Sequence, residues 1–304
     1  MVSESPHPDS PKLRLLRPFS VVISALTYCA GRAGPLFVIV WYACFLRSAS
    51  QLALEWLVLA YPPTMPDALL SQQFYPPTWL TALVIAPWEA MAWLFVLSDM
   101  STGDRNRGSV TLLSEPLRWL RFELNQAVLV AAAIFSAVNL FDGLSRWAQL
   151  QLLVVATSFI QFSNDELEVW ANLSVAARFV ALALVTAWSY PIAGQVLRTG
   201  KLDVAAAWQI MRGNRLRLFI IFLLLMVILT ALDRLLGPAI RGFARFAAND
   251  PLSWTFREAF IGYVLDFPLS ILWIVANAVT VGIVLDTLER RAPRPDPERT
   301  NAQP

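Results

Sequence analysis

Residues 218–236, LFIIFLLLMVILTALDRLL, decide the fold class of this 304-residue chain. Apart from Thr230, the run is apolar from Leu218 to Leu232, and its first charge is Asp233. As an α-helix it would extend about 28 Å, which matches the hydrocarbon thickness of a bilayer. The segment therefore predicts a membrane-spanning helix.

Five further blocks of the same kind surround it. Hydrophobic residues make up 57% of the chain and charged residues only 15%, whereas a soluble domain carries about 25% charge. This balance excludes an ordinary soluble enzyme and predicts an all-α, polytopic membrane helix bundle of six transmembrane helices. The other predicted spans are 35–60, 79–97, 122–141, 173–197 and 259–287.

Shorter amphipathic segments accompany the spans. Residues 19–34 and 204–217 each read as a surface helix followed by a glycine and basic residues. Residues 147–162 are short for a crossing, so they predict an interfacial or re-entrant helix, with a seventh span as the alternative. The helical spacing of Ile240, Phe243 and Phe246 predicts another interfacial helix after the fifth span.

Basic residues set the expected topology, because cytoplasmic loops retain Lys and Arg during insertion. With the N-terminus inside, most of the 24 basic residues fall on the cytoplasmic side. Those in the outer loops are Arg146, Arg234, Arg241, Arg245 and Arg257. We expect a multi-pass protein of the bacterial inner (cytoplasmic) membrane with both termini cytoplasmic. Residues 1–17 and 288–304 are expected to be disordered cytoplasmic tails around a single transmembrane domain, 18–287.

The supply of catalytic side chains is small. His7 is the only histidine, and the two cysteines, Cys29 and Cys44, form no metal-binding motif. These counts argue against Ser-His or Cys-His catalysis and a His-rich metal site, so we expect no catalytic residues, no metal and no cofactor. The arginines follow the predicted span boundaries instead of forming one basic face, which argues against nucleic-acid binding.

Two charged residues fall near the centres of the first and second predicted spans. An ionisable residue at mid-membrane costs about 2.5–3.5 kcal/mol even on a lenient scale, so it needs a partner or water. Because consecutive spans are antiparallel neighbours, we predict an ion pair between Arg47 and Glu89. The favoured interpretation is a structural pair that docks two helices, and the alternative is a proton or anion site.

A second polar group is predicted toward the outer leaflet. Arg178 lies close to the outer end of its span, so we expect it to reach water, with a pair to Asp266 in a polar cavity as the alternative. Asn277 is expected to hydrogen-bond between helices. Pro87, Pro191 and Pro268 are expected to kink three spans.

A weak internal repeat links the two surface-helix segments. Aligning Gly31 with Gly213 matches residues 25–40 to 207–222 without a gap. Both copies would enter the membrane from the same side, so the repeat is expected to be parallel, unlike the inverted repeats of many transporters.

A family resemblance rests on residues 189–224, which carry SYPIAGQVLRTGKLDVAAAWQIMRGNRLRLFIIFLL, on APWEAMAWLFVLSD and on LRWLRFELNQ. These stretches resemble uncharacterised bacterial multi-pass inner-membrane proteins, similar to the membrane domains found beside glycerophosphodiester phosphodiesterases. The resemblance implies six helices with interfacial elements. It supplies no catalytic residues to transfer.

Three classes of function remain. The favoured expectation is a non-enzymatic envelope scaffold, assembly or lipid-organising protein, whose partners are the lipid bilayer and either another membrane protein or a second copy of the chain. The alternative is a small transporter, channel or lipid-moving protein that uses Arg47 and Glu89. An intramembrane enzyme would have to draw its acids from Glu55, Glu89, Asp233 and Asp266.

Overall fold

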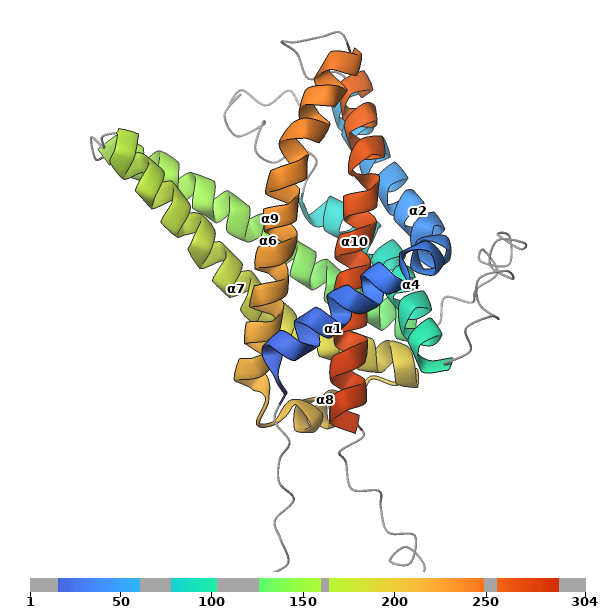
Figure 1. Ribbon diagram of the computed structural model, residues 1–304. Coiled ribbons are helices and arrows are strands. Elements are labelled where there is room, and N and C mark those ends of the chain that lie inside the picture. The colour runs from blue at the N-terminus through green and yellow to red at the C-terminus, as the bar shows by residue number, and fades with distance from the viewer. Residues whose placement is uncertain (1–15, 61–77, 103–125, 160–163, 249–255, 290–304) are drawn as a thin grey trace, which may run out of the picture.

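The computed structural model describes residues 16–60, 78–102, 126–159, 164–248 and 256–289, and every element within these ranges is an α-helix (Figure 1). Six of the helices are long and apolar enough to cross a membrane, which confirms the predicted helical bundle. Their bounds are α2, Ala33–Ala60; α4, Thr78–Thr102; α6, Gln126–Phe159; α7, Asn164–Thr199; α9, Arg215–Ala248; and α10, Phe256–Glu289.

Two predicted interfacial segments are parts of longer helices. The predicted separate helix in 147–162 is wrong, because α6 runs without interruption to Phe159. The predicted helix around residues 240–246 is also the continuation of α9, which passes Pro238 and ends at Ala248. In both places the backbone gains more hydrogen bonds by extending a formed helix than by starting a new one. The described residues therefore contain six candidate spans.

Helix α10 occupies the centre of the bundle. It packs against α1, α2, α4, α7 and α9, and 67% of its most apolar window is buried, against 17% for α7. Small side chains make the close approach possible, as in many membrane helix interfaces. Gly282 illustrates this, since a Cβ there would lie 2.6 Å from the Met100 sulfur of α4.

Two of the described helices are short and lie outside the spans. Helix α1, Pro18–Gly31, crosses the bundle against α9 and α10, and α8, Val204–Met211, lies at the end of the bundle near the last turn of α10 (Figure 1). Asp203 caps α8 by accepting a hydrogen bond from the backbone N–H of Ala206. Both surface helices were predicted, with α1 ending at Gly31 as expected.

The residue before α1 belongs to the packed domain. Leu16 was assigned to the N-terminal tail, yet its side chain is buried, its N–H donates to Asn214 Oδ1 at 3.0 Å and its carbonyl accepts from Arg217 Nη1 at 2.9 Å. These contacts fasten the start of α1 to the start of α9. Apart from Leu16, Arg17, Leu288 and Glu289, the predicted tails lie outside the described residues.

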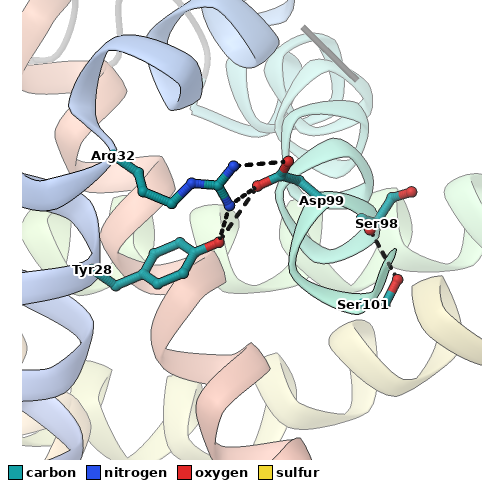
Figure 2. A network of polar contacts seen from close by, with 5 residues as sticks. All are labelled: Tyr28, Arg32, Ser98, Asp99 and Ser101. Carbon is teal, nitrogen blue, oxygen red and sulfur yellow. Dashed lines mark hydrogen bonds and ion pairs between the residues drawn. The ribbon is translucent and has the colours of Figure 1, made fainter. Parts of the chain in front are cut away.

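Helix α1 is also fastened to α4 by the polar cluster in Figure 2. Arg32 Nη1 donates both to the Tyr28 hydroxyl and to Asp99 Oδ2, each at 2.6 Å. Burial raises the pKa of Tyr28 above its ordinary value, against the opposing effect of the Arg32 guanidinium. The neutral hydroxyl is therefore the form that accepts from Arg32 in the folded protein.

The internal repeat is present in the order of elements but not in their packing. A short helix precedes a span in both α1–α2 and α8–α9. However, α1 packs on α9 and α10, whereas α8 packs on α7 and α10. The two connections differ too, because Gly213 has a φ of 83° and Gly31 is not among the positive-φ glycines.

Candidate functional site

The predicted ion pair between Arg47 and Glu89 is present. Arg47 Nε donates to Glu89 Oε1 at 2.9 Å, and the two side chains join α2 to α4. A third helix completes the group, because Asn139 Nδ2 of α6 donates to Glu89 Oε2 at 2.9 Å. Both carboxylate oxygens are thus occupied. Glu89 and Asn139 lie at matching depths, each about 20 Å from the helix ends at Thr102 and Gln126.

Arg178 is paired with Asp142, a partner other than the two predicted alternatives, water and Asp266. Its Nη2 and Nε donate to Asp142 Oδ1 at 2.8 and 3.1 Å, which ties α7 to α6. With 16% of its side chain exposed, Arg178 does not extend alone into solvent as expected. The Asp266 side chain lies outside the described residues. Arg146 also pairs with Asp142 at 2.8 Å, so one carboxylate serves two guanidinium groups.

Asn277 does not make the expected bond between helices. Its Nδ2 donates to the Trp273 carbonyl one turn earlier in α10, at 2.8 Å. A carbonyl oxygen can only accept a hydrogen bond, so the Asn277 atom that faces it must be the amide nitrogen. The other amide atom, Oδ1, points elsewhere. Oδ1 is buried and has no hydrogen-bond partner in the structure.

These groups line one partly open cavity of about 380 Å³. Its polar wall includes Arg47, Glu89, Asn139, Asp142, Arg146, Arg178, Thr186, Thr230, Asp233, Ser270 and Asn277. The volume falls within the usual range for small-molecule sites, about 300–1,000 Å³. Of the predicted site residues, the cavity therefore gathers Arg47, Glu89, Arg178 and Asn277, together with Asp233.

Aromatic side chains form another part of the cavity wall. Trp93, Phe135 and Tyr190 all line it, and the Tyr190 ring lies 4.9 Å from Trp93 and 5.6 Å from Phe135 between centroids. The Tyr190 ring also meets Phe222 of α9, edge to face. This cluster joins α4, α6, α7 and α9. It gives the cavity an apolar surface beside its polar groups, since Trp93 lies one helical turn from Glu89 in α4.

The bundle closes beyond this wall, toward α8. A Cβ on Gly194 of α7 would overlap Val281 Cγ1 of α10, so the two backbones pass very close together. Arg198 Nη2 then bonds Asp286 Oδ1 at 2.5 Å, and Arg198 Nη1 lies 3.5 Å from Glu289. Tight packing and an ion-pair cluster therefore seal this end of the α7–α10 interface.

Two of the three described carboxylates that line the cavity are paired with arginine. Within the described part of the chain, no group of three or more His, Cys, Asp or Glu side chains is placed to hold a metal ion. Glu89 and Asp142 are each committed to arginine. A bonded carboxylate is a poor general base or nucleophile until that bond breaks.

Sequence reasoning missed Asp142, Asn139 and Tyr190. Asp142 directly follows the predicted third span, 122–141, and its i,i+4 spacing to Arg146 was the one available signal. The roles of Asn139 and Tyr190 depend on contacts with other helices.

The chain matches no protein-family model, no curated protein and no solved structure.

Proposed function

We propose that this protein is a membrane carrier that binds a small polar molecule in the cavity lined by residues of α2, α4, α6, α7, α9 and α10. The cavity of about 380 Å³, lined by both mid-bundle ion pairs, is the observation that supports it. An ion pair that only docked two helices would be sealed by packing. Arg47 and Glu89 instead both border open volume.

The arrangement of the two ends supports a carrier rather than a channel. The cavity is partly open, whereas the α7–α10 interface toward α8 is closed by Gly194, Val281 and the Arg198 ion pairs. A carrier exposes its site to one side at a time, and this structure would be the state closed toward α8.

The charge distribution of the sequence adds a direction to this proposal. Under the positive-inside rule the α8 side is cytoplasmic in a bacterial inner membrane, so the cavity opens outward. The scaffold expectation needs only spans and surface helices. The carrier proposal also accounts for the mid-bundle charges, which are costly to retain without a role. It assigns the protein no enzymatic activity.

Cysteine accessibility tests whether the cavity is filled with water. In a Cys29→Ala, Cys44→Ala background, Thr230→Cys would place a thiol on the cavity wall, and Ile228→Cys would place one on an exposed, nearly opposite face of α9. A charged, membrane-impermeant methanethiosulfonate reagent should modify Thr230→Cys from one side of proteoliposomes. It should not modify Ile228→Cys, which would face lipid.

Osmotic swelling of the same proteoliposomes tests transport. A panel of sugars, amino acids, betaines and phosphate salts should include at least one solute that enters faster than into empty liposomes. Modification of Thr230→Cys should abolish that influx, and treatment of Ile228→Cys should leave it unchanged. An unreactive Thr230→Cys thiol, or no influx of any solute, would contradict the proposal.

A further inference from the structure

We infer that the cavity ligand is a zwitterion, a molecule that carries one anionic and one cationic group at separate positions. This inference names the ligand class of the proposed carrier, and it rests on the proposal that the cavity binds a ligand. It depends on how charge is divided along the cavity wall and on a buried acceptor that lacks a donor.

The described positive and negative charges of the cavity are equal in number but unevenly distributed over its wall. The wall holds three arginines and three carboxylates: Arg47, Arg146, Arg178, Glu89, Asp142 and Asp233. Glu89 neutralises Arg47. Asp142 is shared by two arginines, so the wall formed by α6 and α7 keeps a net positive charge.

The wall formed by α9 carries the opposite charge. Asp233 lines the same cavity, is exposed, and has no ion-pair partner within the described part of the chain. The cavity therefore has a positive wall on α6 and α7 and a negative group on α9. A ligand with both charges can satisfy both walls at once. A ligand with only a negative charge would be repelled by Asp233, and a ligand with only a positive charge would be repelled by the arginine pair. Neither has a second charge to offset that repulsion.

The unpartnered amide oxygen of Asn277 points to a donor on the ligand. The residue is only 3% exposed, it lines the cavity, and its Oδ1 lacks a hydrogen-bond partner. A buried acceptor without a donor costs about 1–3 kcal/mol. An N–H or O–H group on a bound ligand would satisfy it. This favours a ligand whose cationic part is a protonated amine over one whose nitrogen is fully methylated.

The apolar side chains of the cavity suit the rest of such a molecule. Phe179, Met226 and Trp273 line it beside the charges, so it also accepts hydrocarbon. Two sources share this chemistry: a free amino-acid-like zwitterion, and the phosphoethanolamine headgroup of a lipid. The ligand class is the same for both, and binding and lipid-movement assays distinguish them.

Binding to the purified full-length protein tests the ligand class. The protein is held in an uncharged maltoside detergent, because a zwitterionic detergent would compete. Titration calorimetry is run with phosphoethanolamine and with γ-aminobutyrate as zwitterions, and with inorganic phosphate, acetate and ethylammonium as single-charge probes. We expect at least one zwitterion to bind, with each single-charge probe weaker by about tenfold or more.

Three substitutions separate the charges from the fold. Arg146→Gln removes the excess positive charge, and because the Arg146 side chain is 62% exposed it leaves Arg178 to pair with Asp142. Asp233→Asn removes the negative group. Each should weaken zwitterion binding by about tenfold, the loss of one charge-assisted contact. Glu168→Gln, on an exposed face of α7 away from the cavity, should leave it unchanged.

The outcomes also separate this inference from the carrier proposal. Binding of phosphate or ethylammonium as tight as that of the zwitterions, or no effect of Asp233→Asn and Arg146→Gln, would overturn the zwitterion inference, even if solute influx is present. Zwitterion binding without any flux would support the binding site and contradict the carrier proposal. Faster flipping of labelled phosphatidylethanolamine than of phosphatidylglycerol in proteoliposomes would assign the site to a lipid headgroup, and influx of free γ-aminobutyrate would assign it to a solute.

Discussion

Asp142 Oδ1 of α6 accepts hydrogen bonds at 2.8 and 3.1 Å from Arg178 of α7, and this pair holds the two helices together beside the cavity. Asp142→Asn would leave Arg178 with a neutral partner in a mostly buried position. Removing one member of a fully buried pair costs about 3–5 kcal/mol, and we expect about 2–4 kcal/mol here because 16% and 20% of these side chains are exposed. Unfolding in mixed detergent micelles measures the change.

A double-mutant cycle supplies the control for this prediction. Asp142→Asn combined with Arg178→Gln should cost less than the sum of the two single changes, because the only described charge that then loses its partner is Arg146, whose side chain is 62% exposed. Additive effects would show that the pair contributes nothing to folding.

Glu89 is expected to be the most sensitive position of the mid-bundle group. It accepts from both Arg47 and Asn139, so Glu89→Gln turns an amide NH₂ toward one of these two donors and leaves Arg47 poorly paired. We expect a lower yield of folded protein, measured by size-exclusion chromatography in detergent, and a smaller loss for Asn139→Ala. Folded yields that match wild type, together with the loss of a pH-dependent flux, would assign Glu89 to proton coupling.

The spans and the Arg47–Glu89 pair could be predicted because each depends on local sequence. Apolar run length predicts a span, and two charges in consecutive antiparallel helices are near neighbours whatever the rest of the bundle does. Arg178 has several carboxylates within reach, so its choice of Asp142 depends on how α6 and α7 tilt and pack. The sequence gives no local sign of that tilt.

Asn277 and the lengths of α6 and α9 show the same limit. An asparagine in a span can bond to its own helix or to a neighbour, and the presence of a cavity beside Asn277 decides the outcome. A polar break in an apolar pattern predicts where a helix leaves the membrane but not where it ends. For this reason α6 and α9 continue past the predicted boundaries.

Gly194 is expected to tolerate no larger side chain. A Cβ there would overlap Val281 Cγ1 and lie 3.3 Å from Leu285 Cδ1, and the stiff β-branched valine has little freedom to move aside. Gly194→Ala should destabilise the protein by about 1–3 kcal/mol, the usual cost of overpacking. Gly34→Ala, where nothing lies within 4 Å of the new Cβ, is the matched control and should be neutral or slightly stabilising.

The double change Gly194→Ala, Val281→Ala checks the cause. It should cost less than the sum of the single changes, because the smaller residue 281 makes room for the new methyl group. Equal stability of Gly194→Ala and Gly34→Ala would mean that α7 and α10 pass farther apart than this structure shows.

The Cys29 thiol should resist alkylation in the folded protein. Burial in α1 against the bundle raises the pKa of Cys29 to about 11, so at pH 8 only about one thiol in a thousand is the reactive thiolate. In a Cys44→Ala background we expect slow maleimide labelling at pH 8 and a rise in rate with pH toward 11. Because folding raises the pKa of Cys29, the thiol stays protonated in the folded state at pH values where the unfolded chain has already lost this proton. The stability of the folded state therefore falls as the pH rises from the ordinary thiol pKa toward 11. Labelling after denaturation in dodecyl sulfate should be fast at pH 8. Rapid labelling before denaturation would show that α1 leaves the bundle readily, and would remove the basis for treating α1 as a fixed part of the fold.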